Sequence, residues 1–435
     1  MQGQPKIGRS EDHPHHEPNH LLEDQTMPNF SIALTGLQAD STALNTIGNN
    51  LANLNTTAFK KQTTTFEDLF YQQIGSSGSG EQLQTGAGVK VAGTASSFLQ
   101  GSLTTTNASS DMAINGDGFF VVQSGQTQSL TRAGNFQLDK SGALITSDGQ
   151  SVMGFPAAGG VVNSTGNLKG IILPIGGNSL AQATQNFSVN GNLDSTAPIG
   201  TAFSTSVNMF DSLGASHLAS VNFKKTSARS WDYTIALPAG DATGTPVNNT
   251  GTLTFNTSGV LTAPAANVAA IQFPTLSDGA ADLNFKWDLY GATGSPTIAQ
   301  SASASTATAS YQDGYASGSY QKFAVDATGL VSATFSNGHV ETMGQLAIAS
   351  VSNPQGLTRV GGNNYQTSAA SGSASFAAAG VGSRGVIQDD ALEGSNVDIS
   401  TEFSELIVAQ RAFQANSKTV TTFDQVTQDA IGMIR

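Results

Sequence analysis

The stretch FSIALTGLQADSTALNTIGNNLANLNTTAFK occupies residues 30–60, and its pattern predicts a helix over 27–60. Apolar side chains recur at alternating intervals of four and three residues, which is the spacing of one helix face. Asparagine, a poor helix former, fills many polar positions, and Asp40 is the only charged residue between Met27 and Phe59. Such a helix is marginal alone, so we expect it to need a partner surface. The apolar seam comprises Phe30, Leu34, Leu37, Leu44, Ile47, Leu51 and Leu54, and the asparagines include Asn49, Asn50, Asn53 and Asn55.

The C-terminal segment 394–435 has a seam of the same kind and predicts a second helix. Its seam residues are spaced by seven, with one more three residues beyond the last: Ile399, Leu406, Phe413, Val420 and Phe423. Either Asp398 or Ser400 is placed to cap the start of this helix. The periodicity leaves two arrangements open. Each helix packs on its own globular core, or the two termini pair as a coiled coil, which is typical of proteins that assemble.

The region between the two helices predicts β-structure throughout. Short apolar runs alternate with turns rich in Gly, Asn, Ser and Asp, as in DMAINGDGFFVV at 111–122. The low-complexity stretch AQSASASTATAS at 299–310 is predicted to be an exposed connection. We therefore expect a mainly β fold with helical termini. The predicted divisions are a linker or extended connecting segment at 61–97, an inner β domain in two parts at 98–175 and 313–393, and an outer β domain inserted at 176–312.

Composition narrows the classes of function. A chain of 435 residues is too long for one core, and two to four domains are expected. Charged residues make up only 11%, less than half of the usual share of about 25%. The net charge of −13 argues against nucleic acid as a partner, and the lack of cysteine excludes disulfides, thiolate metal sites and cysteine nucleophiles. No apolar run approaches the length of about 18 residues that membrane insertion needs.

No catalytic constellation is visible, so we predict that the chain is not an enzyme and has no cofactor, no metal site and no catalytic residue. His217 and His339 lie in polar turn sequence and are predicted to be surface residues. Glu402 and Glu405 read as a solvated pair on a helix face. Residues 1–26 contain four histidines but little apolar content, so we predict a disordered tail rather than a metal site. Met27 is an alternative start, and the segment lacks the apolar core of a cleavable signal peptide.

Three segments together resemble the bacterial flagellar rod–hook family. The first runs from ALTGLQA at 33–39 to NNLANLNTTAFK at 49–60, where Ala58 stands in place of the glycine that the family often has. The second is DMAINGDGFFVV at 111–122 with TRAGNF at 131–136, and the third is EGSNVD at 393–398 with AQRAFQAN at 409–416. Besides the asparagines of the first helix, the motif residues are Phe59, Gly116, Gly118, Arg132, Gly134, Phe136, Asn396, Asp398, Gln410, Arg411 and Asn416.

The resemblance implies a structural subunit that self-assembles into a tube for bacterial motility. The large insertion at 176–312 favours the hook, a flexible joint that transmits torque from the basal-body rod to the filament. The implied partners are further copies of the chain, rod proteins below, the hook cap during assembly and the hook–filament junction proteins above. The resemblance also implies export by the flagellar type III apparatus without a cleaved signal. The alternatives are a distal rod subunit and, in another class, a secreted β-rich adhesin or glycan-active protein.

Overall fold

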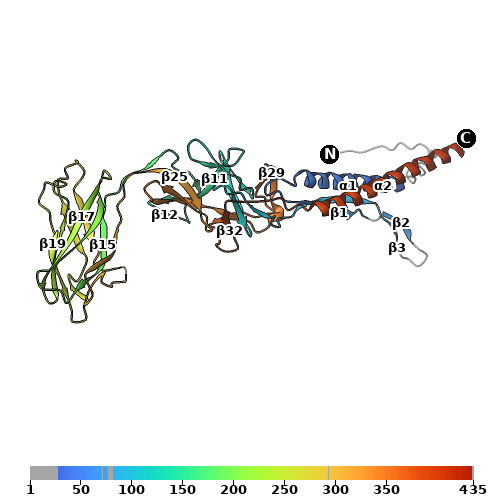
Figure 1. Cartoon of the computed structure of the whole chain (residues 1–435). Coiled ribbons are helices and arrows are strands. Elements are labelled where there is room, and N and C mark those ends of the chain that lie inside the picture. The colour runs from blue at the N-terminus through green and yellow to red at the C-terminus, as the bar shows by residue number, and fades with distance from the viewer. Residues whose placement is uncertain (1–27, 71, 77–81, 292, 434–435) are drawn as a thin grey trace, which may run out of the picture.

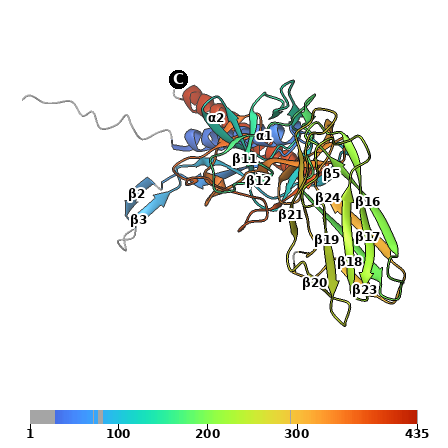
Figure 2. The same ribbon diagram turned by 90° about the vertical axis from the view of Figure 1, so that its left-hand side faces the viewer.

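The computed structural model describes residues 28–70, 72–76, 82–291 and 293–433, and shows an elongated molecule (Figure 1). Two helices lie side by side at one end, a β domain occupies the middle, and a second β lobe forms the other end. Figure 2 shows that this outer lobe is inclined to the line of the helix pair. The predicted tail, with His13, His15, His16 and His20, lies outside the described residues. Within the described part, no helix combines the length and hydropathy that a membrane span requires.

Helix α1 spans Pro28–Ala52, and helix α2 spans Ile399–Met433. The first helix is shorter than predicted, because residues 53–58 fold into turns and a bend. The Asn53 side chain donates to the Asn49 carbonyl at 2.8 Å, which is the local bonding that makes asparagine favour helix ends. The second helix also begins later than residue 394. Its start follows Asp398, whose Oδ1 accepts the Thr401 N–H at 2.7 Å, so Asp398 is the cap among the two predicted candidates.

The two helices pack together in antiparallel fashion. Asn416 Nδ2 donates to Asp40 Oδ2 at 2.8 Å, and nearer the β domain Asn50 Nδ2 donates to Glu402 Oε2 at 3.1 Å. From the first contact to the second, the residue number rises along α1 and falls along α2, so the two helices run in opposite directions. The termini therefore pair with each other, and the arrangement with a separate core for each helix is wrong.

Residues 61–97, predicted as a linker or extended connecting segment, contain two antiparallel strand pairs. Strand β1 (Gln62–Asp68) pairs with β4 (Val89–Ser96), and β2 (Gln72–Ser76) pairs with β3 (Gln82–Thr85). The β1–β4 ribbon lies along α1, where Thr64 Oγ1 donates to Thr46 Oγ1 at 2.9 Å. Through this hydroxyl, β1 forms a hydrogen bond with the polar face of α1. Local sequence patterns cannot predict this contact between a strand and a helix.

The inner β domain is built from two parts of the chain that interleave in one 15-stranded sheet system. Strand β11 (Ser151–Ala158) pairs with β27 (Val340–Leu346), and β7 (Phe119–Ser124) pairs with β28 (Ile348–Ser350). Phe120, Phe136 and Leu346 meet in its core. The other elements are β5 Leu103–Thr105, β6 Met112–Asn115, β8 Thr127–Thr131, β9 Gln137–Leu138, β10 Leu144–Ile145, β12 Val161–Val162, β13 Lys169–Gly170, β14 Asn178–Ser179, β25 Gly318–Val325, β26 Leu330–Phe335, a 3-10 turn Pro354–Gly356, β29 Thr358–Gly361, β30 Asn364–Gln366, β31 Ser375–Ala377, β32 Val386–Asp389 and β33 Ala391–Glu393.

The outer lobe is a sandwich of two five-stranded sheets around an aromatic core that includes Phe187, Trp231 and Trp287. One sheet holds β15 (Asn186–Asp194), β21 (Val268–Phe273), β22 (Leu283–Trp287), β23 (Ile298–Ser301) and β24 (Thr306–Gln312). The other holds β16 (Ala202–Phe210), β17 (Ser216–Ser227), β18 (Ser230–Ala236), β19 (Thr250–Phe255) and β20 (Leu261–Ala263).

The stretch 299–310 is mostly exposed, as predicted, but it is not an irregular connection, because it contains most of β23 and β24, which both pair with β15. Small residues carry little hydrophobic signal, so these strands are recognisable only by their backbone pairing.

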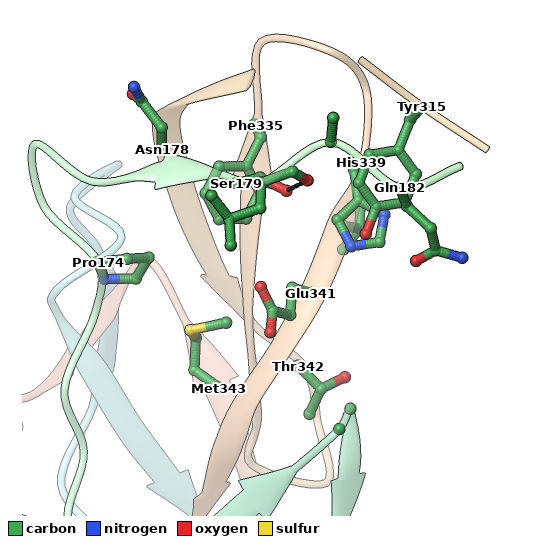
Figure 3. Close-up of a pocket in the computed structure, with 15 residues that line it drawn as sticks. Pro174, Asn178, Ser179, Gln182, Tyr315, Phe335, His339, Glu341, Thr342 and Met343 are labelled. Carbon is green, nitrogen blue, oxygen red and sulfur yellow. Dashed lines mark hydrogen bonds between the residues drawn. The ribbon is translucent and has the colours of Figure 1, made fainter. Parts of the chain in front are cut away.

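Two extended segments connect the outer lobe to the inner β domain. The first passes through β14 and the second enters β25, and these two strands pair with each other. Beyond that pair, Gln182 and Tyr315 form an isolated antiparallel bridge. The first segment also borders a groove against β26 and β27, which His339, Glu341 and Met343 line (Figure 3). We call residues 180–184 and 313–317 the connector.

Candidate functional site

The predicted seam of the helix pair is only partly covered within one chain. Leu34 and Ile399 are 42% and 46% exposed, while Ile47 is buried. The side chain of Phe30 lies outside those described. The half-buried members are Leu37, Leu44, Leu51, Leu54, Leu406, Phe413, Val420 and Phe423, of which Leu54 lies beyond the end of α1. The helix pair therefore leaves apolar surface that a single chain does not bury.

A second set of exposed apolar side chains lies on α2 and was missed by the heptad pattern. Phe403, Ile407 and Val408 are 52%, 57% and 69% exposed. Val408 also lines a mostly apolar groove between α1, β1 and α2, together with Phe66. Fully burying one such side chain stabilises an interface by roughly 1.5–3 kcal/mol. The signal in the sequence was the apolar content of α2 outside its seam. We call Phe403, Ile407 and Val408 the outer face of α2.

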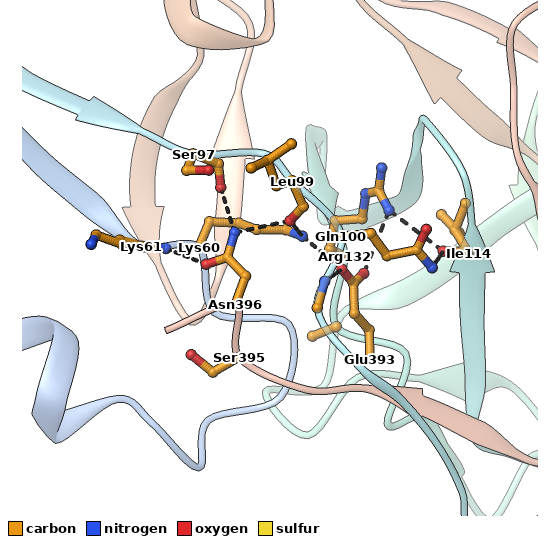
Figure 4. Close-up of polar contacts among 12 residues, drawn as sticks. Lys60, Lys61, Ser97, Leu99, Gln100, Ile114, Arg132, Glu393, Ser395 and Asn396 are labelled. Atoms are coloured by element: carbon orange, nitrogen blue, oxygen red, sulfur yellow. Dashed lines mark hydrogen bonds and ion pairs between the residues drawn. The ribbon is translucent and has the colours of Figure 1, made fainter. Parts of the chain in front are cut away.

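At the base of the helix pair, three distant segments meet in a buried ion cluster (Figure 4). Lys60 Nζ lies 2.6 Å from Glu393 Oε1, and neither side chain is exposed. Arg132 Nη1 lies 3.5 Å from the other carboxylate oxygen, Glu393 Oε2. Burial lowers the pKa of Lys60 and of Arg132, and the Glu393 carboxylate opposes that shift in both. One carboxylate thus compensates two buried cations, and Lys60 also donates to the Leu99 carbonyl at 2.8 Å.

A second polar cluster fixes the start of α2 to the end of α1. Lys61 Nζ lies 2.6 Å from Glu402 Oε1, and the Glu402 side chain is fully buried. The expectation that Glu402 is solvated is therefore wrong, while Glu405 remains 48% exposed. Burial lowers the pKa of Lys61, but the hydrogen bond and charge of Glu402 outweigh it and raise that pKa above its ordinary value. The ammonium stays charged, so the pair holds the two helix ends together.

Two asparagines of the motifs bond to the backbone of neighbouring segments. Asn50 accepts the Gln62 N–H at 2.9 Å and donates to the Gln62 carbonyl at 2.8 Å. Asn396 accepts the Lys61 N–H at 2.7 Å and donates to the Ser97 carbonyl at 2.9 Å (Figure 4). An amide can donate and accept at once, which a carboxylate cannot, and this explains asparagine at both positions.

Some of the remaining motif residues shape the same junction, and the others lie elsewhere. Phe59 is buried under the Arg359 guanidinium, whose carbon lies 5.3 Å from the ring centroid. Arg132 Nη2 donates to the Gly116 carbonyl at 2.8 Å. Gly116 and Gly118 have φ of 107° and 123°, which favour glycine. Three motif residues are exposed: Asn55, Gln410 and Arg411. Asn49 and Asn416, which lie on the helix pair, form hydrogen bonds with Asn53 and Asp40 respectively. Phe136 packs on Phe120 in the core of the inner β domain.

Gly134 is predicted to tolerate no side chain. A methyl group there would collide with the carbonyl oxygen of Met112, which belongs to the core. We expect Gly134→Ala to lower the free energy of unfolding of the inner β domain by about 2–3 kcal/mol, as in other overpacked sites. Urea unfolding followed by near-ultraviolet circular dichroism measures it. Gly93→Ala is the control, because among the described residues no atom other than those of its own chain neighbours lies within 4 Å of a methyl group there. Equal stability of the two variants would contradict the prediction.

The two histidines that were predicted to be surface residues differ in the structure. The prediction is wrong for His217, which is only 6% exposed and contacts three aspartates of the outer lobe. His339 is half-buried, and its ring stacks on Tyr315 with a centroid separation of 4.1 Å (Figure 3). The local sequence around His217 is polar, so only the tertiary structure reveals its burial.

Comparisons with known proteins place three segments in flagellar families. Residues 30–60 match the family "Flagella basal body rod protein", and residues 388–433 match "Flagellar basal body rod FlgEFG protein C-terminal". Residues 180–315 match "Flagellar basal body protein FlaE D2 domain". These matches overlap both helices and the outer lobe.

Similar proteins cover nearly the whole chain. The flagellar hook protein FlgE of Salmonella typhimurium is 33% identical over 421 residues, which are 93% of this chain and 99% of that protein. FlgE of Escherichia coli is 34% identical over 424 residues, with 93% and 99% covered. FlgE of Treponema pallidum is 31% identical over 458 residues, with 92% and 98% covered. The crystal structure of Helicobacter pylori flagellar hook protein FlgE2 covers 67% of this chain and all of that chain, with a TM-score of 0.51 at 15% identity, a likeness of fold.

Proposed function

The chain belongs to the flagellar hook protein FlgE family, and on this premise we propose that it is the structural subunit that self-assembles into the flagellar hook. The hook is the flexible tube that transmits torque from the basal-body rod to the filament. The observation that carries the proposal is the outer face of α2, whose apolar side chains are more than half exposed in a single chain and would be buried by a neighbouring copy. A distal rod subunit and a secreted adhesin are not favoured, because relatives that match more than nine-tenths of the chain are hook proteins.

We infer that the helix pairs of successive copies pack against each other and form the inner wall of the tube. Asp40 is the only charged residue of α1, so this wall offers little electrostatic hold on chains that pass through it. The buried ion cluster at Lys60, Arg132 and Glu393 joins the helices firmly to the inner β domain. Forces on the helices thereby reach the outer parts of the subunit. The predicted domain divisions at 61–97, 98–175, 176–312 and 313–393 belong to this proposal.

The partners and the route of export are part of the same proposal. They are other copies of the chain, rod proteins, the hook cap, the hook–filament junction proteins and the flagellar type III export apparatus, which takes the subunit without cleaving a signal. The subunit works outside the cell in the hook, by self-assembly and without catalysis or a cofactor. A low content of charged residues suits a flexible tube. Neighbouring subunits that touch through small polar side chains can slide past each other with little loss of interaction energy, whereas ion pairs between them would fix their relative position.

Deletion of the gene in the source bacterium tests the proposal. Electron microscopy of purified basal bodies should show complete rods without hooks, and expression of the chain should restore hooks and swimming. Rods that end early would identify a distal rod subunit instead. Intact hooks in the deletion strain would contradict both assignments.

The outer lobe is predicted to be dispensable for export and tube formation. The bridge between Gln182 and Tyr315 places the two ends of the lobe side by side. Deletion of 183–314 with a Gly-Gly join should therefore leave the inner β domain folded, with an unfolding free energy changed by no more than about 1 kcal/mol. Immunoblots of secreted protein and electron microscopy of the tubes measure export and curvature. We expect secreted subunits and tubes of altered curvature. Loss of secretion would mean that the lobe carries export information.

A further inference from the structure

Four ionisable side chains meet at the end of the outer lobe that adjoins the connector. His217 at the start of β17 is buried, and its Nε2 lies 3.0 Å from Asp211 Oδ2. Its Nδ1 lies 2.9 Å from Asp241 Oδ2, in the segment that follows β18. Asp278, between β21 and β22, places Oδ2 at 3.8 Å from Nε2. Within the described residues, no other charged group forms an ion pair with this ring.

Hydrogen bonding requires a doubly protonated ring. Both ring nitrogens face carboxylate oxygens, which only accept when ionised, and imidazolium alone donates at both nitrogens. Asp211 is held in its ionised form, because its Oδ1 accepts the N–H groups of Leu213 at 2.8 Å and Ala215 at 2.9 Å. Burial raises the pKa of Asp211, but hydrogen bonding with Asp278, with His217 and with these N–H groups lowers it to about 2. The ring therefore faces the ionised carboxylate of Asp211.

The sign of the pH dependence follows from these contacts. Burial by itself lowers the pKa of His217, but the hydrogen bonds and charges of Asp241 and Asp211 outweigh it and raise the pKa above the ordinary value. A raised value means that the stabilisation is complete below about pH 6.5, the unfolded value, and is lost as pH rises through the folded value. The Asp211 contribution has the opposite sign and is lost only in strong acid, towards pH 2.

The cluster ties together loops from both sheets of the lobe. Ser277 N–H donates to the Asp241 carbonyl at 2.9 Å, and Ala281 N–H donates to Ser212 Oγ at 3.0 Å. The turn 211–215 therefore contacts the loop between β21 and β22 directly, as well as through His217. Loss of one positive charge at the centre would leave three carboxylates facing each other across these loops.

The same turn packs against the connector. Phe210 N–H donates to Thr184 Oγ1 at 2.8 Å, and Thr184 N–H donates to the Phe210 carbonyl at 2.8 Å. A methyl group added at Gly214 would lie 2.8 Å from Ala181 Cβ and 3.2 Å from Ala316 Cα, so the turn touches both strands of the connector. Movement of the turn is thus transmitted to the segments that join the two β domains.

We propose that protonated His217 is a pH-sensitive clamp that holds the base of the outer lobe together and limits the motion of the connector. The clamp is closed at mildly acidic pH and opens as the ring loses its second proton. The proposal goes beyond hook assembly and concerns the single chain, so it can fail while the hook assignment stands.

A divalent metal is the other cation that Asp211, His217 and Asp278 would hold, since their ligand atoms lie within 4.8 Å of one another. The proton accounts better for the geometry. The separations of 3.0 and 2.9 Å at the two ring nitrogens are both ordinary hydrogen-bond lengths. Metal binding is therefore an outcome of the test that would overturn the clamp.

The first measurement is a pH titration of the histidine ring resonances by NMR in the full chain. The signal that disappears in His217→Asn identifies the ring. We expect its pKa above 6.5, and a fall by roughly one unit or more in Asp241→Asn, which removes one charged acceptor. Asp232→Asn is the matched control, because Asp232 bonds to Thr252 on the outer lobe and not to the ring. An unchanged pKa in Asp241→Asn, or one equivalent of Zn²⁺ bound by the wild type, overturns the proposal.

The second measurement reports on the connector. The chain has no cysteine, so spin labels at Ser164→Cys and Ser258→Cys report only the separation of the two β domains. We expect a narrow distribution of distances near pH 5.5 and a broader one near pH 8.5, on either side of the histidine range. Asp241→Asn should broaden the distribution at the lower pH, whereas Asp232→Asn should not. Equal widths at the two pH values in the wild type would contradict a clamp on the connector.

Discussion

Replacement of Glu393 by alanine is expected to destabilise the inner β domain by about 3–5 kcal/mol, because it leaves two buried cations without their carboxylate. Lys60 and Glu393 are both fully buried, and Arg132 is nearly so. The carboxylate also accepts the Gly101 N–H at 2.9 Å, so a backbone donor is left unpaired as well. Urea unfolding of the purified monomer measures the loss, and the same variant should form few hooks in cells.

The exposed pair of Lys90 and Glu67 provides the control. Its ammonium and carboxylate also lie 2.6 Å apart, but the side chains are 53% and 49% exposed. We expect Glu67→Ala to cost no more than about 1 kcal/mol, since water screens such pairs. If Glu393→Ala lowers the free energy of unfolding no more than Glu67→Ala does, the buried cluster does not hold the helices to the inner β domain.

The double variant Ile407→Asp with Val408→Asp is expected to prevent tube assembly while the monomer stays folded. Both side chains are more than half exposed in one chain, so the fold loses little. In the tube each would be buried, which contributes roughly 1.5 kcal/mol or more per side chain. The combined loss should raise the concentration needed for assembly by about a hundredfold or more. Light scattering and electron microscopy of purified protein give this concentration.

Two exposed valines of the outer lobe provide the control, because the same replacement of an apolar side chain by aspartate can be made there, away from the helices. Val247 and Val260 are 45% and 44% exposed. The double variant Val247→Asp with Val260→Asp should assemble at close to the wild-type concentration, because the proposal assigns assembly to the helix pair. Tubes from the Ile407 and Val408 variant at the wild-type concentration would show that the outer face of α2 is not an assembly surface.

Local patterns were sufficient for the elements whose spacing repeats within a few residues. The seams from Leu34 to Leu51 and from Ile399 to Val420 predicted both helices, and Asp398 marked the start of the second. Short apolar runs with glycine-rich turns predicted the β-structure between them. Strands β23 and β24 were not predicted, because runs of Ala, Ser and Thr carry little hydrophobic signal. Strand β24 is exposed along almost its whole length, so it has no buried apolar face that would reveal it.

The sequence by itself determined the order of the elements, because helix and strand periodicities are local properties of the chain. Only the tertiary structure decided which polar residues are buried. Lys60 and Glu393 are separated by 333 positions, and Asn50 and Glu402 by 352, so no local pattern pairs them. His217 and Glu402 stand in polar sequence and read as solvated, yet each is enclosed by segments that come from elsewhere in the chain. Burial of a charge depends on the partner that compensates it, and that partner is chosen by the packing of the whole molecule.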